Sequence, residues 1–328
     1  MIEEIAANLY RVEIPLPKNP LRALNSYVVK GPERNLIIDT GWNQQECLRA
    51  MLAGLAKLGV DIRETDFFIT HLHTDHIGLL SKLATDTSTI YFNKPDADRI
   101  QSGISWSDFA DFARLNGFPE EELQKVFDNH PGFKFRSNEP LRFHLLREGD
   151  RIDLTDYVFM CVETAGHTKG HMCLYEANRK LLLAGDHILG DITPTISLWS
   201  DEWNPLEEYL RSLDKVYGLD IELVLPGHRR TLRKSKERIQ ELKHHHWERL
   251  EEIVSILEQG GQDAFQVASQ MTWDIVYDSW ELFPVSQKWF ATGEAIAHLK
   301  YLEEKGMIRK EMQKEKIVFS LNDMLPHH

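Results

Sequence analysis

The stretch from Thr70 to His76 carries three histidines and an aspartate at spacings that suit a metal centre. The residues are His71, His73, Asp75 and His76. Imidazole nitrogens and carboxylate oxygens are ligands that zinc and related divalent ions bind. A chance cluster of surface histidines is the alternative, but a pattern this dense is rare in a chain with 15 histidines. The motif therefore predicts one reaction centre built on a pair of metal ions.

The residues before this motif should form the strand that positions it. The segment from Asp66 to Thr70 is mostly apolar and ends in a β-branched residue, which is typical of a buried strand. Alternate side chains of an extended chain share a face. His71 and His73 can therefore converge on one ion, while Asp75 and His76 turn toward a second.

Three further segments place a ligand-type side chain directly after a strand-like run. They are residues 157–162 before His167, residues 181–185 before Asp186, and residues 223–227 before His228. Two helices are also indicated by apolar residues at helical spacing, over 47–58 with a cap at Gly59 and from Asn204-Pro205 to Gly218. Strands thus alternate with helices, which indicates a mixed α/β fold.

Taken together, these segments resemble the metallo-β-lactamase superfamily. Its HxHxDH signature, a distant histidine, an aspartate after Ala-Gly and a histidine after Pro-Gly occur here in the expected order, and residues 36–41 look like its first motif. The resemblance covers about residues 1–235. It implies an αββα sandwich of the α/β (α+β) class, with a helical insertion at about 96–146.

The resemblance also implies a role for each ligand-type residue. The first ion would be held by His71, His73 and His167; the second by Asp75, His76 and His228; and Asp186 would bridge both. Asp75 and Asp186 would be the catalytic carboxylates. The cofactor would be two divalent metal ions, with zinc favoured and iron or manganese as alternatives, and a hydroxide bridging them would attack the substrate.

The remaining histidines and one aspartate have supporting or structural interpretations. Asp39 fits the superfamily's first motif and is expected to orient a ligand rather than bind metal. His171 and His187 lie beside ligand positions, and hydrogen-bonded structural roles are favoured for both. The run 244–246 falls in a charged helix and is interpreted as solvated surface. The terminal pair 327–328 is set aside.

Composition predicts a cytoplasmic protein. No apolar run reaches the roughly 18–20 residues that a membrane helix needs, and the acidic N-terminus does not resemble a signal peptide. The three cysteines, Cys47, Cys161 and Cys173, are scattered and odd in number, which indicates reduced core residues rather than disulfides. A net charge of −13 argues against nonspecific nucleic-acid binding.

One basic cluster stands out in this acidic chain. Its members follow His228 directly, and they are Arg229, Arg230, Arg233, Lys234, Lys236 and Arg238. The solvated start of a helix and an anion-binding surface are equally good interpretations. Cations at a helix N-terminus oppose the helix dipole, which favours a phosphate or carboxylate partner.

Aromatic residues mark the helical insertion at about 96–146. They are Trp106, Phe109, Phe112, Phe118 and Phe127. Such residues usually pack, so a helical insertion with its own small core is the simpler interpretation. A lid that selects an apolar acyl group is the second, and Ile196, Leu198, Trp199 and Trp203 could line the same pocket.

The residues after about 235 look like a separate C-terminal domain, 236–328, which follows the main domain, 1–235. Helices are expected at about 234–258, 263–271 and 287–305, followed by a hairpin at 307–310 and 316–321. This order resembles a winged-helix domain. Because the chain is acidic, packing, dimerisation as a homodimer or shaping of the pocket is favoured over DNA binding.

Two classes of activity follow from the resemblance. The favoured one is hydrolysis of an ester, thioester or lactone carbonyl in a small-molecule substrate. That substrate is expected to be an acyl compound, and an anionic group on it is an open alternative. Residues 166–171 look like the corresponding loop of glyoxalase II. The alternative is a phosphodiesterase, as in β-lactamase-like endoribonucleases with a terminal winged helix. A metal-bound regulator without catalysis is a third, non-enzymatic interpretation. An antibiotic-resistance lactamase and a di-iron flavoprotein are disfavoured.

Overall fold

The computed structural model describes residues 1–103, 106–135, 141–154, 156–274 and 276–322. The terminal histidines 327–328 lie outside the described residues. The chain divides into two compact units. The first unit comprises Met1–Gly103, Pro131–Pro194 and Ser212–Ile239, and the second comprises Ile104–His130, Thr195–Arg211 and Gln240–His328.

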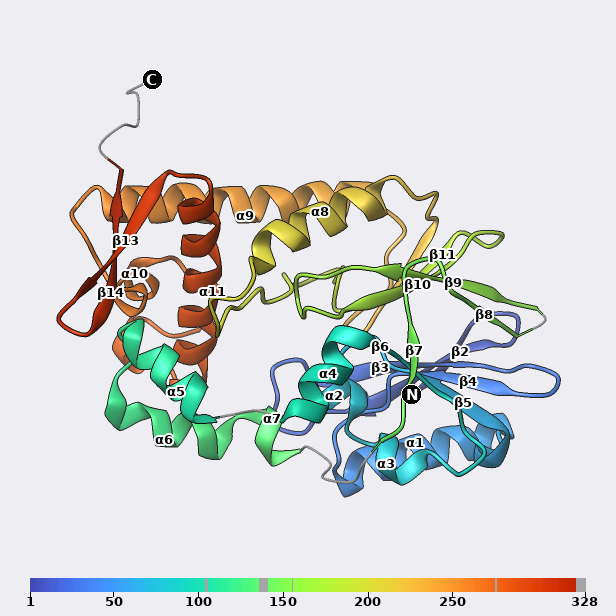
Figure 1. The fold of residues 1–328 in the computed structure, drawn as a ribbon. Coiled ribbons are helices and arrows are strands. Elements are labelled where there is room, and N and C mark those ends of the chain that lie inside the picture. The colour runs from blue at the N-terminus through green and yellow to red at the C-terminus, as the bar shows by residue number, and fades with distance from the viewer. Residues whose placement is uncertain (104–105, 136–140, 155, 275, 323–328) are drawn as a thin grey trace. The chain divides into compact units, whose positions relative to one another are not determined.

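Two β-sheets form the frame of the first unit (Figure 1). The seven-stranded sheet runs in the order β1 (Ile2–Ala6), β2 (Leu9–Pro15), β3 (Ala23–Val29), β4 (Asn35–Ile38), β5 (Thr65–Phe68), β6 (Ile90–Asn93), β7 (His144–Leu146). The five-stranded sheet runs in the order β12 (Leu223–Pro226), β11 (Leu181–Gly185), β10 (Met172–Glu176), β9 (Val158–Glu163), β8 (Arg151–Asp153). Strands β4 to β7 pair in parallel, as do β11 and β12.

The two sheets share one apolar core. Tyr27 and Phe68 of the seven-stranded sheet pack in the same buried cluster as Phe159, Leu174 and Leu183 of the five-stranded sheet. A second cluster lies between the other face of the seven-stranded sheet and its helices. Central strands are therefore buried on both faces, which explains why β4, β5 and β11 are buried at every position instead of at every second one.

Helices cover the sheets on their outer sides and complete the αββα sandwich that the sequence predicts. The helices and 3-10 turn of this unit are α1 (Gln45–Leu58), η1 (Ile62–Glu64), α2 (Thr74–Ile77), α3 (Leu80–Leu83), α4 (Lys94–Ser102) and α7 (Pro131–Lys134). Helix α1 ends at Gly59 in the left-handed conformation, as expected. Helix α8 (Pro205–Tyr217) ends beside β9, because Ser212 donates a hydrogen bond to the carbonyl of Ala165 and Lys215 to that of Glu163.

The second unit consists mainly of helices. Its elements, besides the start of α8, are α5 (Trp106–Leu115), α6 (Glu120–Asn129), α9 (Ser235–Leu257) from Gln240 onward, α10 (Ala264–Gln270), the 3-10 turn η2 (Trp280–Leu282), α11 (Val285–Glu304), β13 (Ile308–Gln313) and β14 (Lys316–Leu321). The three C-terminal helices and the hairpin match the sequence prediction in place and order. The winged-helix assignment stays a prediction.

The aromatic residues of the helical insertion lie in one apolar cluster with residues of the C-terminal helices. Phe118 and Val126 belong to one buried cluster with Trp289 of α11, and Trp199 stacks on Trp289 with ring centroids 3.6 Å apart. The ends of the 96–146 stretch, in α4 and α7, belong to the first unit. The apolar cluster of the insertion is thus completed by Trp289, a residue of α11.

One histidine of the run 244–246 also differs from the prediction. His244 is exposed, but His246 is completely buried and its Nδ1 lies 3.0 Å from Nε2 of His298 on α11. Successive helical residues point about 100° apart, so three in a row cannot all face solvent on a helix that packs against another.

Among the described residues, no helix is long and apolar enough to cross a membrane.

Candidate metal centre

All seven residues that the sequence indicates as metal ligands lie together in the first unit. They form three overlapping groups whose ligand atoms lie within 4.8 Å of one another: His71, His73, His167; His71, His76, Asp186; and Asp75, His76, His228. The carboxylate of Asp186 lies between the histidines of the predicted first and second ion. Its oxygens are 3.6 Å from Nε2 of His167, 3.5 Å from Nε2 of His76 and 3.6 Å from Nε2 of His228.

The strands bring these residues together although they are far apart in the sequence. Strand β5 leads into the HxHxDH loop, and the short helix α2 carries Asp75 and His76, so that His76 lies beside both His71 and Asp75. Strands β11 and β12 are parallel neighbours, so Asp186 and His228, which follow them, meet at one edge of the sheet.

Glycine is required where these two strands end. A Cβ atom on Gly227 would lie 2.7 Å from Oδ1 of Asp186 and 2.8 Å from the His76 ring. Gly185 has a φ of +47°, and a Cβ there would lie 2.8 Å from Thr70. The Ala-Gly-Asp and Pro-Gly-His motifs thus have a steric reason, because the backbone passes very close to the ligand side chains.

The outer ring nitrogens of three histidines are held by partners. Asp39 lies 2.7 Å from Nδ1 of His76, Nδ1 of His228 lies 2.8 Å from the carbonyl oxygen of Ala23, and Nδ1 of His71 lies 3.0 Å from Oγ1 of Thr70. Such partners fix ring orientation and leave Nε2 facing the centre. Asp39 also accepts hydrogen bonds from the backbone N–H and hydroxyl of Thr70, which fits the expected supporting role.

Several buried atoms at the centre make no hydrogen bond within the described part of the chain. They are Nε2 of His76, Nε2 of His228 and Oδ1 of Asp186. Buried polar atoms are normally paired, so this set calls for a partner. Two imidazole nitrogens and a carboxylate oxygen that converge on one place are suited to a divalent cation. The donor set therefore fits a metal.

The electrostatics of the centre favour positive charge between its carboxylates. Burial alone would raise the pKa of Asp75, but His76 and His228 outweigh it and bring that pKa to about 2. Burial lowers the pKa of His73 to about 3, helped by His167. The pKa of His76 is instead raised well above its usual value, because Asp39 and Asp186 outweigh burial. An ionised Asp75 and a neutral His73 are in the protonation states that metal binding needs, whereas the proton on His76 would be displaced by a metal ion.

The neighbouring histidines and cysteines have structural surroundings. His171 accepts a hydrogen bond at Nε2 from the backbone N–H of Asp186 and lies 2.8 Å from the hydroxyl of Thr164, so its structural interpretation is confirmed. His187 is fully buried and belongs to none of the three ligand groups. The cysteines are all buried and unpaired with one another, as expected for core residues.

Sequence reasoning missed Asp96, a buried aspartate at the start of α4. Its carboxylate accepts hydrogen bonds from the backbone N–H groups of Leu72 and Gly170 and from the hydroxyl of Thr168. Burial raises its pKa to about 6 although these hydrogen bonds act in the opposite direction. A signal was present, since Asn93 before Pro95 is a typical helix start, but nothing in the sequence linked that helix to the ligand loops.

The basic cluster after His228 is largely engaged with the protein itself. Nε of Arg230 lies 2.6 Å from Asp191, and Nζ of Lys234 lies 2.7 Å from Glu237. Arg238 donates hydrogen bonds to two backbone carbonyls in the segment after β11. These contacts favour the interpretation of a solvated and paired helix start over that of an anion-binding surface.

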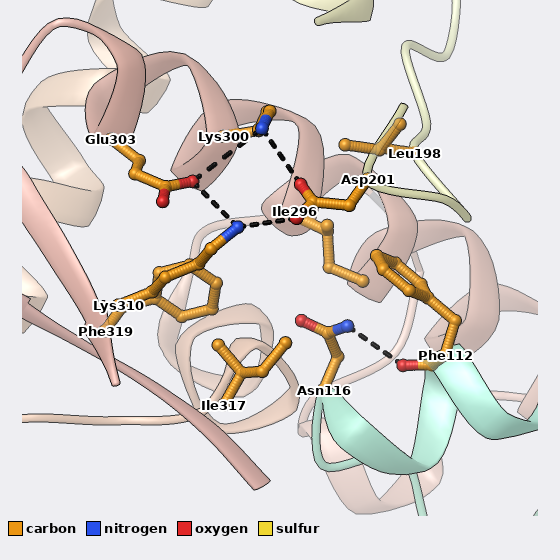
Figure 2. Close-up of a pocket in the computed structure, with 10 residues that line it drawn as sticks. All are labelled: Phe112, Asn116, Leu198, Asp201, Ile296, Lys300, Glu303, Lys310, Ile317 and Phe319. Carbon is orange, nitrogen blue, oxygen red and sulfur yellow. Dashed lines mark hydrogen bonds and ion pairs between the residues drawn. The ribbon is translucent and has the colours of Figure 1, made fainter. Parts of the chain in front are cut away.

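A separate small pocket lies within the second unit (Figure 2). Figure 2 shows Lys300 and Lys310 directed at Asp201, with Nζ–Oδ distances of 2.9 and 2.7 Å. Lys310 also lies 3.2 Å from Glu303, and apolar side chains such as Ile296 line the rest. Because its charges pair with one another, this pocket offers no open charge to a ligand.

Two family models match the chain. The model of the family described as "Metallo-beta-lactamase superfamily" matches residues 20–228, and that described as "Metallo-beta-lactamase-like, C-terminal domain" matches residues 250–320. The probable metallo-hydrolase YqjP of Bacillus subtilis is 27% identical over 303 residues, which are 89% of this chain and 92% of the relative. The acyl-coenzyme A thioesterase MBLAC2 of Homo sapiens is 28% identical over 217 residues, 62% of this chain and 72% of the relative.

A solved structure extends the likeness to the whole chain. The metallo-beta-lactamase family protein TTHA1429 from Thermus thermophilus superimposes with a TM-score of 0.77 at 26% identity, covering 97% of this chain and 100% of that one. The family match covers well over half of the sequence, and the ligand-type residues of its motifs meet in space. The chain belongs to the metallo-beta-lactamase superfamily and is a hydrolase of that superfamily.

Proposed function

We propose that this protein hydrolyses an acyl thioester at a centre of two zinc ions. The observation that carries the proposal is the position of Asp186, within 3.6 Å of Nε2 atoms from both predicted ligand groups. A carboxylate so placed would serve both predicted ligand groups. The similarity to acyl-coenzyme A thioesterase MBLAC2 supports the thioester as substrate.

In this proposal the side chains divide the work between holding and orienting. His71, His73 and His167 would hold one ion, and Asp75, His76 and His228 the other. When bound, two such ions lower the pKa of water to about 7 and stabilise the oxyanion that forms on a carbonyl. Asp39 and the carbonyl of Ala23 keep Nε2 of His76 and of His228 turned inward.

Two arguments favour a thioester over the alternatives. A thiol has a pKa of about 8.5, so a thiolate leaves a tetrahedral intermediate with less need of a proton donor than an alkoxide does. A phosphodiester polymer would need unpaired cations along its backbone. Arg230, Lys234 and Arg238 instead bind groups of the protein. The phosphodiesterase alternative therefore receives no support from the basic cluster.

The test is turnover of an acyl-coenzyme A, an N-acyl lactone and bis(p-nitrophenyl) phosphate by zinc-loaded protein. Asp186→Ala is the critical variant. Asp220→Ala, which removes a carboxylate that is 73% exposed, is the matched control. We expect the thioester to be hydrolysed by the wild-type protein and by Asp220→Ala, and not by Asp186→Ala, while circular dichroism shows the same fold for all three.

Two results would contradict the proposal. Normal turnover by Asp186→Ala would remove the bridging role. Turnover of the phosphodiester alone would show that the substrate is a phosphodiester and not a carbonyl compound. Arg229 and Arg233 of the basic cluster would then be the candidate residues for binding it.

A further inference from the structure

A single buried carboxylate connects the two loops that carry His71, His73 and His167. Asp96 is 1% exposed and lies in the first turn of α4. Its Oδ2 accepts a hydrogen bond of 2.9 Å from the N–H of Leu72, the residue between His71 and His73.

The other contacts of Asp96 reach the loop that follows His167. Oδ2 also accepts a hydrogen bond of 2.8 Å from the hydroxyl of Thr168, and Oδ1 accepts one of 2.9 Å from the N–H of Gly170. Each oxygen thus has its own backbone donor, one from each loop. All three bonds are made to the segments around the first ligand group.

The loop after His167 lies so close to α4 that only glycine fits. A Cβ atom on Gly170 would lie 1.7 Å from Oδ1 of Asn93 and 2.8 Å from the backbone nitrogen of Asp96. Asn93 in turn caps α4 by accepting a hydrogen bond of 2.8 Å from the N–H of Asp96. The carboxylate therefore stands on a capped helix end that is pressed against the loop, and its place is closely defined.

We propose that Asp96 is a positioning residue that sets the affinity of the ion bound by His71, His73 and His167, and not that of the ion bound by Asp75, His76 and His228. The inference rests on the proposed two-metal centre. A ligand set binds tightly when its members are already in place, and loss of an outer partner typically weakens metal binding about 10–100-fold. Asp96 holds residues adjacent to all three ligands, because Leu72 lies between His71 and His73 and Thr168 follows His167.

The experiment is a zinc titration of metal-free protein against a chromophoric chelator. The critical variant is Asp96→Asn, because an amide has one acceptor oxygen and cannot serve the N–H groups of both Leu72 and Gly170. The matched control is Asp98→Asn on the same helix, where the carboxylate is 56% exposed and pairs with Lys94. His167→Ala and His228→Ala provide references for loss of the first and of the second ion.

We expect two ions in the wild-type protein and in Asp98→Asn. Asp96→Asn should bind one ion about 10–100-fold more weakly and the other unchanged. The absorption spectrum of its cobalt form should resemble that of His167→Ala and not that of His228→Ala. A purely structural role would lower thermal stability without this selectivity.

Each alternative outcome has its own meaning. If Asp96→Asn binds both ions as tightly as the wild-type protein, or loses both equally, the positioning role is refuted while the metal centre stands. If the wild-type protein binds no pair of ions, the proposed function itself fails, and the inference with it. If Asp96→Asn does not fold, Thr168→Val removes only one of the three hydrogen bonds, and it must weaken the same ion selectively for the inference to hold.

Discussion

The buried histidine pair of the second unit should make stability depend on pH in a way that one substitution can reveal. His298 is fully buried, its Nδ1 donates to the carbonyl of Glu294, and its Nε2 faces Nδ1 of His246. Burial brings the pKa of His298 to about 3. The pKa of His246 is lowered in the same direction, by burial and by His298. The ring of Tyr209 lies nearly perpendicular to that of His246, with ring centroids 5.4 Å apart.

The direction in which the unfolding free energy changes with pH depends on whether the folded or the unfolded state binds the proton more tightly. The folded protein keeps His298 neutral down to about pH 3, whereas the unfolded chain binds a proton near pH 6.5. His298 therefore contributes full stability above pH 6.5, and this is lost as the pH falls toward 3. Between about pH 7.5 and pH 5 the loss is about 2 kcal/mol, from one proton bound over about 1.5 pH units at 1.36 kcal/mol per unit.

Glu294, on the same helix, acts in the opposite direction. Burial raises its pKa to about 7, and Arg249, whose Nε lies 3.8 Å from its carboxylate, lowers it only in part. Its contribution is present below the unfolded value of 4.5 and is lost as the pH rises through about 7. Acidification from about pH 7.5 to pH 5 therefore raises the contribution of Glu294 to the unfolding free energy by about 2 kcal/mol. The pH-dependent contributions of Glu294 and His298 thus largely cancel in the wild-type protein.

Two variants should separate these opposing contributions. On acidification, His298→Gln should lose about 2 kcal/mol less unfolding free energy than the wild-type protein, and Glu294→Gln about 2 kcal/mol more. The cost of imperfect packing is the same at both pH values and drops out of the comparison. Urea unfolding at each pH, followed by the fluorescence of the tryptophans that include Trp289, measures the difference.

The control is His244→Gln, whose side chain is 73% exposed on α9. It should follow the wild-type protein at both pH values. Metal-loaded samples at one zinc concentration keep any contribution of the metal centre equal in all proteins. If His298→Gln differs from the wild-type protein by the same amount at both pH values, His298 takes up its proton alike in the folded and unfolded states, and the reasoning is refuted.

Three further outcomes are expected. Asp39→Asn removes the carboxylate beside Nδ1 of His76 and should weaken zinc binding about 10–100-fold in a chelator competition, and unchanged affinity would show that Asp39 does not orient the ligand. Trp289 is 2% exposed and stacks on the ring of Trp199, so Trp289→Ala leaves a cavity there. Urea unfolding should show an unfolding free energy lower by about 3–5 kcal/mol. A decrease below about 1 kcal/mol would contradict that packing. Removal of zinc by a chelator should lower the melting temperature of the wild-type protein in a calorimetric scan. The same treatment should lower the melting temperature of Asp186→Ala by less. Equal decreases would show that the ions bind at a site without Asp186.

The sequence was most informative where chemistry and local structure coincide. His71, His73, Asp75 and His76 are neighbours in the chain, and they stay neighbours in space on one loop and one short helix. The helix ends behaved in the same way, because a left-handed Gly59 is a local requirement of the backbone. Such features can be read from a few residues without knowledge of the rest of the fold.

The sequence was least informative where an apolar face is completed by distant residues. The aromatic residues Phe109 and Phe127 correctly indicate helices that pack on one side, but they do not say against what. Trp289 fills that role, and no pattern near Phe118 points to it. The burial of His246 was missed for the same reason, since a polar residue in a charged helix gives no sign that His298 faces it.

The outer partners of the metal ligands lie between these two cases. The chain separation between His76 and Asp39 is 37 residues, yet Asp39 could be indicated because it lies in the segment 36–41 that resembles the superfamily's first motif. The partner of His228 is a backbone carbonyl, that of Ala23, 205 residues away. Any residue type would supply that oxygen, so no residue identity encodes it. The position of β3 relative to the end of β12 decides which carbonyl faces the ring, and the hydrogen bond from the N–H of Asn25 to the carbonyl of Gly227 helps to fix that position. The geometry that prepares His228 for a metal is thus a property of the strands' alignment, and substitutions that disturb this alignment should weaken the centre without touching a ligand.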